Sequence, residues 1–538
     1  MHGLMQDRPL SLPMLMDGME HRFSRKHVTT TQPDGTVSAS YGEVAGRVRR
    51  LAGVLDALDV PAGARVGSFG WNSQRHLELY MAVPCTGRVL HTINHRLFTE
   101  DLAYIVDDAA DDVLFVDRSI LDVVRPLLDT CPSVRHLIVM DDGSPAEPSA
   151  DPRVHDYESL LAAARPVEAF EPVAERTAAA LCYTSGTTGR PKGVLYDHRS
   201  IVLHAMTLLM ADTFAISEGD TVMPIVPMFH VNAWGLPYAA LMAGADLVMP
   251  GPVMASDRLV STMAEHRVTF AAAVATVWRG MVPHLDGADL GALRHMVSGG
   301  GALPESLSRV FLEKTGLPLR SSWGMTETSP LVCSARISSE EAATLSEDDR
   351  VTALAAPGPP TMLCSLRLVA EDGSLAPRDG EHRGELQVAG PTVAAGYYGA
   401  HPQPSAFTED GWLRTGDVAT IDRHGVVRIV DRTKDLIKSG GEWISSVELE
   451  NAIMAMPGVL EAAVIAVPDD KWGERPLACV VPLPDARLTA EDVRAHLAGR
   501  VAKWWIPERV VMRDGLPKTA SGKFAKAALR QSMAAGTL

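Results

Sequence analysis

The pattern of apolar and polar positions divides most of the chain into two kinds of segment that alternate. Short apolar runs typical of buried strands, such as Ala64–Gly70 and Asp112–Asp117, each precede a segment with the apolar spacing of a helix. The same order recurs at 268–278, where a strand-like run precedes a helix-like segment. This alternation predicts an α/β architecture in which helices cover sheets.

The pattern changes between Gly384 and Val430, where short apolar runs are joined by turns at 409–412 and 423–425. Such closely spaced runs indicate an antiparallel β subdomain. After Asp431, further apolar runs and a helical segment indicate a small α+β unit of about a hundred residues. We therefore predict a first domain at 1–431, a hinge at 432–435 and a second domain at 436–538.

Composition and charge narrow the classes of function. The chain has 538 residues, too many for one ordinary core, so two or more domains are expected. Its net charge of −16 argues against broad nucleic-acid binding, which needs a basic surface. No apolar run approaches the roughly 18–20 residues of a membrane helix, and no signal-peptide pattern opens the chain. The six cysteines lack CxxC spacing, so we expect reduced thiols in a cytoplasmic protein without a stable membrane span.

The stretch YTSGTTGRPKG, Tyr183–Gly193, has the composition of a phosphate-binding loop. Its glycines let backbone N–H groups approach an anion, and its lysine offers a positive charge. The flanking patterns predict the order strand, loop, helix. It is not a Walker loop, because no Ser or Thr follows the lysine. A surface turn is the alternative interpretation. The candidate phosphate-binding residues are Thr184, Ser185, Gly186, Thr187, Thr188, Gly189 and Lys192.

Seven segments, taken in order, closely resemble the motifs of the adenylate-forming superfamily, which contains acyl-CoA synthetases, adenylation domains of peptide synthetases and luciferases. The resemblance covers nearly the whole chain, and the wording at 227–235 is similar to the fatty-acyl-CoA synthetase branch. The segments are Tyr183–Gly193, Pro227–Gly235, Ser298–Pro304, Ser321–Pro330, Gly411–Asp417, Val430–Ser445 and Leu516–Lys523.

The resemblance implies both a fold and a two-step reaction. The fold would be a large N-terminal α/β domain, with two sheet–helix subdomains plus a β subdomain, and a small mobile α+β C-terminal domain. The reaction would use ATP and Mg²⁺ to convert a carboxylic acid to an acyl-adenylate, and then coenzyme A to form a thioester. Pyrophosphate and AMP would be released. Because the first step joins two anions, the site must supply positive charge and exclude water.

The resemblance also assigns roles to charged residues. Lys523 would bridge the substrate carboxylate and the α-phosphate, and Glu327 would hold Mg²⁺ together with Thr184. Asp417 would accept hydrogen bonds from the ribose hydroxyls, and Arg432 would reach the ribose or a phosphate. The alternatives are a surface lysine, a helix-capping glutamate and a surface ion pair.

The adenine slot would combine bare backbone with the ring of Trp323, at a position where relatives often carry tyrosine. The three residues before it read RSS, whereas many relatives have Gln-Gly, so the adenine and acyl contacts would differ in detail. The predicted adenine-binding residues are Gly299, Gly300, Gly301, Trp323, Gly324, Met325 and Thr326.

The segment at 227–235 would form the acyl site. His230 would lie near the substrate carboxylate, and Trp234 would gate an apolar tunnel for a medium- to long-chain fatty acid. Ordinary packing of His230, Phe229 and Trp234 in a core is the alternative. Ala275 stands where this branch more usually has proline in a pocket wall. The predicted acyl-pocket residues are His230, Val231, Trp234 and Gly300.

Lys434 corresponds to a hinge about which the small domain would rotate between the two half-reactions. Rotation would withdraw Lys523 and bring in a glycine hairpin that admits the thiol along bare backbone. A plain hairpin turn is the alternative. The predicted CoA-binding residues are Lys438, Ser439, Gly440, Gly441, Glu442 and Trp443.

Other functions stay open at this point. They are a CoA ligase for an aryl or short thioether acid, a luciferase-like oxygenase that consumes the adenylate, and a non-catalytic nucleotide-binding protein. The last would be expected to lack Lys523 or Glu327. No carrier-domain motif follows, which disfavours a peptide-synthetase module. A homodimer is expected from similar fatty-acyl enzymes.

Two weaker patterns are assigned structural roles. His91 and His95 have the i, i+4 spacing of a helical metal site, but their segment is not helix-like and has no nearby acid pair. Cys182 precedes the phosphate loop and is expected to be a buried small side chain rather than a nucleophile.

Overall fold

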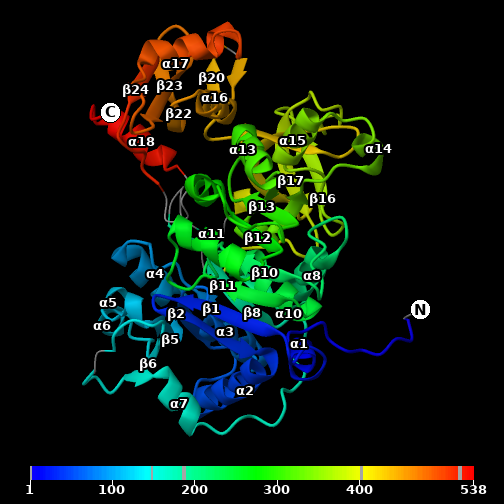
Figure 1. Ribbon diagram of the computed structural model, residues 1–538, viewed down its shortest axis with the longest axis vertical. Coiled ribbons are helices and arrows are strands. Elements are labelled where there is room, and N and C mark those ends of the chain that lie inside the picture. The colour runs from blue at the N-terminus through cyan, green and yellow to red at the C-terminus, as the bar shows by residue number, and fades with distance from the viewer. Residues whose placement is uncertain (1–2, 147–148, 185–189, 400–403, 441, 519–523) are drawn as a thin grey trace.

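Strands and helices alternate along most of the computed structural model, which describes residues 3–146, 149–184, 190–399, 404–440, 442–518 and 524–538. Its described strands form four sheets. In Figure 1 the blue N-terminal elements lie at one end of the molecule and the orange and red C-terminal elements at the other. The predicted α/β fold with a small C-terminal α+β domain is confirmed.

The first sheet is parallel except at the edge strand β9, and its order is β7-β6-β5-β3-β4-β8-β9. Its central strands are nearly continuous apolar runs because helices cover the sheet. The strands are β3 (Arg65–Phe69), β4 (Val89–Thr92), β5 (Asp111–Asp117), β6 (His136–Met140), β7 (Val154–Asp156), β8 (Ala178–Tyr183) and β9 (Gly193–Asp197). The helices include α2 (Tyr41–Ala57), α3 (Gln74–Cys85), α4 (Thr99–Ala109), α5 (Leu121–Val124), α6 (Leu127–Thr130) and α7 (Tyr157–Ala163).

The second sheet has a parallel centre and an antiparallel strand at each edge, in the order β15-β14-β13-β12-β10-β11-β1-β2. The strands are β1 (His27–Gln32), β2 (Gly35–Ser40), β10 (Thr221–Pro224), β11 (Asp246–Met249), β12 (Phe270–Val274), β13 (His295–Gly299), β14 (Arg320–Gly324) and β15 (Leu331–Ser334). Its helices are α8 (His198–Leu209), α10 (Leu236–Ala243), α11 (Ser256–Glu265), α12 (Ala275–Met281), α13 (Glu305–Thr315), α14 (Ser339–Ala342) and α15 (Glu347–Ala355); the short α1 (Pro13–Asp17) precedes β1.

One buried side chain joins the two sheets at the carboxyl ends of their strands. Asn72 follows β3 of the first sheet and is 4% exposed. Its Nδ2 donates to the carbonyls of Pro224 and Val226, at 2.6 and 2.9 Å, and its Oδ1 accepts from the backbone N–H of Met228 at 2.7 Å. The segment after β10, which leads to His230, is therefore fixed by the first sheet.

The third sheet is wholly antiparallel, as predicted for 384–430, and it gains one earlier strand. Its order is β16-β17-β18-β19. The strands are β16 (Ser365–Val369), β17 (Gly384–Ala389), β18 (Leu413–Ile421) and β19 (Val427–Arg432).

The fourth sheet belongs to the C-terminal unit and has its own apolar core, which includes Leu449, Val464 and Val480. Arg279 of α12 connects this unit to the large domain, because its Nη1 donates to the carbonyl of Leu460 at 2.6 Å. The strands are β20 (Ile437–Ser439), β21 (Glu442–Ile444), β22 (Val459–Asp469), β23 (Gly473–Pro482) and β24 (Arg509–Met512). The helices are α16 (Ser446–Met454), α17 (Ala490–Leu497) and α18 (Lys526–Ala534).

None of the helices in the described ranges has the length and apolarity needed to cross a lipid bilayer. The six cysteines are free thiols and buried, which includes Cys182, as expected.

Candidate active site

The phosphate-loop motif spans a β-hairpin. Tyr183 at the end of β8 pairs with Gly193 at the start of β9, and the two strands run antiparallel. The expected order of strand, loop and helix is therefore wrong, because a strand intervenes before α8. At the base of the loop, the backbone N–H of Thr184 donates to the Lys192 carbonyl at 2.9 Å, and the Lys192 N–H donates to Thr184 Oγ1 at 3.2 Å. The predicted residues Ser185, Gly186, Thr187, Thr188 and Gly189 lie outside the described residues.

Helix α4 contacts both flanks of this hairpin. The Tyr183 hydroxyl donates to Asp108 Oδ2 at 2.6 Å, and the Arg190 guanidinium lies 5.0 Å from the ring centroid of Tyr104. Burial, together with the Asp108 carboxylate, raises the pKa of Tyr183, so its phenol stays a donor. No sequence motif marked α4, because its link to the loop exists only through the sheet.

A tyrosine outside the seven motifs joins two predicted residues. The Tyr397 hydroxyl donates to Glu327 Oε1 at 2.7 Å, and the Lys192 ammonium lies 5.0 Å from the centroid of the Tyr397 ring. Glu327 is 6% exposed and follows β14 in a short 3₁₀ turn, Thr326–Thr328. Burial and the nearby Glu327 carboxylate raise the pKa of Tyr397. Lys192 and Glu327, far apart in sequence, therefore lie on either side of one phenol.

Asp417 on β18 is 3% exposed and has a donor on each oxygen. The Trp323 indole Nε1 donates to Oδ2 at 2.9 Å, and Arg432 Nε lies 3.3 Å from Oδ1. The second contact follows from the sheet, because Asp417 and Arg432 are direct cross-strand partners of β18 and β19. The structure thus brings the predicted nucleotide residues Trp323, Asp417 and Arg432 together.

The predicted adenine glycines lie at the carboxyl ends of β13 and β14. Gly300 has a φ of 77°, a left-handed conformation that glycine adopts without strain, and a Cβ on Gly301 would meet open space. Gly324 tolerates no side chain, because a Cβ there would lie 1.9 Å from the Pro330 carbonyl oxygen. The next two residues are held through the backbone: Met325 N–H donates to Thr328 Oγ1 at 2.9 Å, and the Thr326 carbonyl accepts from Tyr196 at 2.6 Å.

The residues after His230 form a left-handed turn, α9 (Val231–Trp234). The φ angles of Val231, Asn232, Ala233 and Trp234 are 48°, 53°, 49° and 55°, and Gly235 continues at 74°. A left-handed conformation costs an L-residue roughly 1–2 kcal/mol, so the surrounding packing must hold this turn in place. No pattern in the sequence predicted it.

Trp234 packs directly on the adenine strand. A Cβ on Gly299 would lie 2.8 Å from Cη2 of the Trp234 ring, so only glycine leaves room for the indole. Gly299 ends β13, whose neighbour β14 contains Trp323. The predicted acyl and nucleotide residues therefore meet along one sheet edge.

The imidazole of His204 on α8 lies behind this turn. A Cβ on Gly235 would lie 2.5 Å from His204 Nδ1, and Nε2 accepts from the Leu331 N–H at 3.3 Å. Burial lowers the pKa of His204 from 6.5 to about 3, so the folded protein keeps it neutral.

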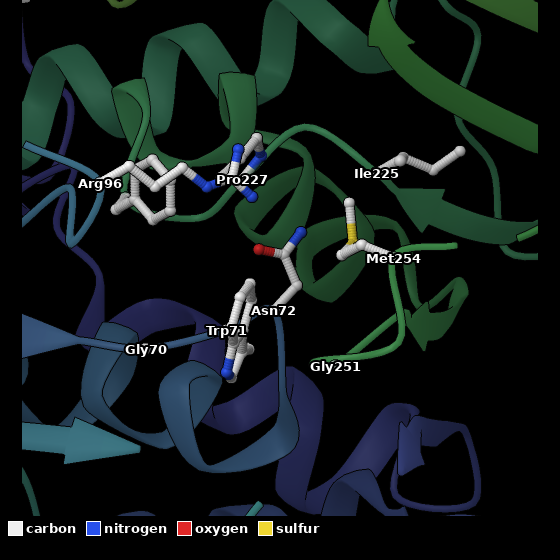
Figure 2. Close-up of a pocket in the computed structure, with 9 residues that line it drawn as sticks. Gly70, Trp71, Asn72, Arg96, Ile225, Pro227, Gly251 and Met254 are labelled. Carbon is white, nitrogen blue, oxygen red and sulfur yellow. The ribbon is translucent and has the colours of Figure 1, made fainter. Parts of the chain in front are cut away.

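A small pocket lies beside Phe229, the residue that precedes His230. Figure 2 shows Trp71 and Asn72 on one side of it and Ile225 and Pro227 on the other, with Arg96 reaching toward Pro227. The Arg96 guanidinium is 5.7 Å from the Phe229 ring centroid. The lining of this pocket does not include the predicted acyl-pocket residues His230, Val231, Trp234 and Gly300, all of which the structure describes.

Two different surfaces of the C-terminal unit contact the large domain. Lys518 Nζ lies 2.5 Å from Glu461, whose neighbour Leu460 accepts from Arg279, so the segment before Lys523 lies near α12. Lys523 itself is outside the described residues. Lys438 Nζ lies 3.7 Å from Glu371, in the turn that follows β16 of the third sheet.

The predicted CoA-binding residues form the β20–β21 hairpin. Lys438 Nζ lies 4.1 Å from the centroid of the Trp443 ring, and Ser439 accepts from Arg475 at 3.3 Å. Gly440, with a φ of 63°, donates to the Trp472 carbonyl at 2.8 Å. Glu442 pairs with Ser439 across the hairpin, and Gly441 lies outside the described residues.

The connection between the domains is held by side chains on both sides of Lys434. Asp431 Oδ2 accepts from the backbone and the hydroxyl of Ser446, both at 2.6 Å, and that hydroxyl also accepts from Lys526 Nζ at 2.7 Å. Arg530 of α18 donates to the carbonyl of Lys434 at 3.3 Å and pairs with Asp435.

The comparisons with known proteins agree with this geometry. Residues 20–398 match the family model of the AMP-binding enzyme, and residues 448–523 match that of the AMP-binding enzyme C-terminal domain. The chain belongs to the AMP-binding enzyme family. This confirms the predicted adenylate-forming superfamily. Long- and medium-chain-fatty-acid–CoA ligases among the relatives confirm the predicted fatty-acyl-CoA synthetase branch.

Relatives in this family align over nearly their full length. The chain is 46% identical to a long-chain-fatty-acid–CoA ligase of Thermus thermophilus, covering 98% of this chain and 96% of the relative. It is 40% identical to a 3-methylmercaptopropionyl-CoA ligase of Ruegeria lacuscaerulensis, covering 98% of each chain. An ATP-bound MatB structure from Rhodopseudomonas palustris superimposes with a TM-score of 0.84 at 27% identity, covering 98% of this chain and 100% of that one.

The two family models leave a gap at 399–447. Asp417, Arg432, Lys434 and the β20–β21 hairpin all lie in this gap, so neither family model covers them. Neither spaced histidine supports a metal site: His91 Nδ1 lies 2.8 Å from Asp111 in the core, and His95 packs against Trp71 at 4.7 Å.

Neutral His204 makes the stability of this enzyme depend on pH. The unfolded chain binds a proton near pH 6.5, whereas folded His204 does so near 3, so the unfolded state holds more protons between these values. Stability should therefore fall as pH drops below about 6.5. We expect His204→Gln to remove about one proton, or about 1.4 kcal/mol per pH unit, from the slope of unfolding free energy against pH.

The measurement is denaturant unfolding of both proteins at a series of pH values from neutral to about 5. His284→Gln, at an exposed histidine, serves as the control and should leave the slope unchanged. Equal slopes for wild type and His204→Gln would contradict the prediction.

Proposed function

We propose that this protein activates a medium- to long-chain fatty acid with ATP and transfers the acyl group to coenzyme A. The observation that carries the proposal is the shared edge of β13 and β14. Gly299 lies against Trp234 on the acyl side, and Trp323 binds Asp417 on the nucleotide side. A fatty acid is supported by the relatives that act on long- and medium-chain fatty acids, at 46% and 39% identity.

In the first step a carboxylate oxygen attacks the α-phosphorus of ATP and pyrophosphate leaves. Both reactants are anions, so catalysis consists of positioning and of positive charge at the reacting oxygens. We assign Lys523 to the carboxylate and α-phosphate, Lys192 to the departing pyrophosphate and His230 to the substrate carboxylate. No protein nucleophile is required, in keeping with the buried, hydrogen-bonded Cys182 thiol.

Thr184 and Glu327 suit a magnesium ion that accompanies the triphosphate. Glu327 is buried; its Oε1 accepts from the Tyr397 hydroxyl, and its Oε2 has no donor among the described residues. A single carboxylate with free lone pairs, beside phosphate oxygens, is the ligand set that Mg²⁺ prefers. The ion would neutralise charge on the leaving pyrophosphate. Tyr397 orients the carboxylate, and Thr184 is held in place by the hairpin base.

The nucleoside would be held by Asp417 and the β13–β14 edge. Trp323 and Arg432 contact the Asp417 carboxylate from two directions and fix its orientation. A carboxylate accepts hydrogen bonds from hydroxyls well, so Asp417 suits the ribose hydroxyls. Because the indole N–H is hydrogen-bonded and the ring is half-buried against the core of the third sheet, the orientation of the ring is fixed. The adenine would then lie along Gly300, Gly301 and Gly324.

The second step would follow rotation of the small domain about Lys434. With Lys438 beside Glu371 and the Lys518 segment beside α12, the observed contacts suit adenylation. Rotation would bring the Lys438–Trp443 hairpin to the adenylate, where Gly440 and Gly441 admit the thiol. Thioester formation then releases AMP.

We also propose that the enzyme acts in the cytoplasm as a homodimer. Six free cysteines suit a reducing compartment. The dimer is proposed from the resemblance to fatty-acyl enzymes alone.

The substrate class is tested by a panel of straight-chain fatty acids, aryl acids and 3-methylthiopropionate, scored by CoA-dependent AMP formation. We expect the highest kcat/KM for medium to long fatty acids. A short thioether acid is the second candidate, because two relatives with that substrate are each 40% identical. A preference for the thioether or an aryl acid would replace the fatty-acid assignment, and oxygen uptake with the adenylate would indicate a luciferase-like reaction.

The role of Lys523 is tested by Lys523→Ala. We expect carboxylate-dependent pyrophosphate exchange to fall roughly 10²–10³-fold, because a contact made in the transition state is lost. Thioester formation from premade acyl-adenylate should survive. Lys518→Ala, which removes a lysine paired with Glu461, is the matched control and should retain exchange. Unchanged exchange in Lys523→Ala would show that another residue supplies the charge.

The role of Tyr397 is tested by Tyr397→Phe. Removing a hydrogen bond to a charged group should raise the Mg²⁺ concentration for half-maximal pyrophosphate exchange by roughly tenfold or more. The KM for the acid should change little. Tyr398→Phe is the neighbouring control. If both variants need the same Mg²⁺ as wild type, Tyr397 does not orient a magnesium ligand.

A further inference from the structure

The left-handed turn Val231–Gly235 is held from three sides by groups outside its own motif. Residues with L-stereochemistry avoid this conformation, so four non-glycine residues in a row will keep it only while their surroundings enforce it. The turn is therefore held in one conformation by its surroundings and would relax to another backbone conformation without them. Its last non-glycine residue is Trp234.

The first contact is a buried polar chain from β8 and β4. The Cys182 thiol donates to Asn232 Oδ1 at 3.5 Å, and its sulfur lies 3.2 Å from Thr92 Oγ1. Asn232 is 5% exposed and Cys182 1% exposed, so water does not replace this bond. Burial raises the pKa of Cys182 to about 11, so the sulfur keeps its proton and remains a donor.

The second contact closes the turn at its far end. Gly235 lies against His204, where even a methyl group would collide with the imidazole. His204 is itself fixed by the N–H of Leu331 at the start of β15. The turn is thus held between β8 on one side and α8 with β15 on the other.

The third contact transmits the position of the turn to the acyl site. The Trp234 indole rests on the bare backbone of Gly299 and is 8% exposed. Because Trp234 is itself part of the turn, a change in the backbone at Asn232 must move the ring relative to β13. The ring position in turn sets the space beside Gly299 and Gly300.

We propose that Asn232 and Cys182 are positioning residues that set the acyl-chain preference, by holding the turn and with it Trp234 against Gly299. This rests on the proposed acyl site. When the Cys182–Asn232 bond is lost, the turn relaxes, the indole withdraws, and the site accepts longer or bulkier apolar acids. The hydrogen bond therefore acts on specificity through Trp234, without touching the substrate.

The test compares acyl profiles of Cys182→Ala, Cys182→Ser and Asn232→Gly with wild type. Asn232→Gly keeps the left-handed backbone accessible but removes the acceptor. We expect Cys182→Ala and Asn232→Gly to raise the ratio of kcat/KM for long over medium acids by about threefold to tenfold. Cys182→Ser, which keeps a donor, should restore the wild-type ratio, and the KM for ATP should not change.

Asp59→Gly is the matched control, since Asp59 is an exposed non-glycine residue with a φ of 52° far from the site. It should leave the profile unchanged. Folding of each variant is checked by circular dichroism and thermal unfolding. If Asn232→Gly does not fold, the Cys182 pair decides the result on its own.

A double-mutant cycle identifies the route. In a Trp234→Ala background, Cys182→Ala should no longer shift the profile, because the indole through which it acts is absent. An equal shift in both backgrounds, or no shift in folded Cys182→Ala and Asn232→Gly, would overturn the proposal. The wild-type panel separates this from the proposed function: if wild type prefers aryl or thioether acids, the fatty-acid assignment fails, while the same variants still report on bulkier members of that class.

Discussion

The hydrogen bonds of Asn72 set the geometry on which the rest of the site depends. Two largely parallel sheets share an apolar core, but apolar packing is not directional and does not by itself align the carboxyl ends of their strands. Asn72 adds a directional contact, because three bonds from one buried amide tie the end of β3 to the segment after β10. An amide in the core is stable only with its partners in place, so the two edges are locked at one separation. The segment that this lock fixes leads directly to His230.

The left-handed turn that follows this segment and the glycine at the end of β13 divide the site into an acyl side and a nucleotide side. Trp234 fills the space above Gly299, and Trp323 on the adjacent strand points its indole N–H at Asp417. Glycine is required at position 299 for packing alone, independently of any nucleotide. The phosphate side has its own support, in which Tyr397 lies between Lys192 and Glu327 and α4 braces the hairpin. Rigid support of this kind suits a reaction that depends on position and charge rather than on a nucleophile.

The small domain is attached by contacts that differ in strength on the two sides of Lys434. Asp431 is bound to Ser446, and through it to Lys526, within the buried start of α16. Lys526 also lies 2.7 Å from Glu450, a buried carboxylate whose pKa is raised by burial. These bonds hold α16 and α18 against the end of β19 in the observed orientation, so the proposed rotation about Lys434 would have to break those that Asp431 makes. By contrast, Lys438 and Glu371 form an exposed pair, which contributes little and is easily exchanged during a rotation.

The sequence by itself determined the α/β alternation and the antiparallel β subdomain, and it supplied the charged candidates of the proposed site. The periodicity of apolar positions and the spacing of residues in a motif are local properties of the sequence. Glu327, Asp417 and Lys192 each belong to a short motif of this kind. The sequence did not reveal that β9 follows the phosphate loop, because a strand of five residues directly before a helix is too short to show a clear apolar pattern of its own. Tyr397, Asp108, Asn72 and the left-handed turn were likewise decided only by the tertiary structure. The side-chain hydrogen bonds that give them their roles join residues 50 to 156 positions apart, and such long-range contacts leave no local pattern in the chain.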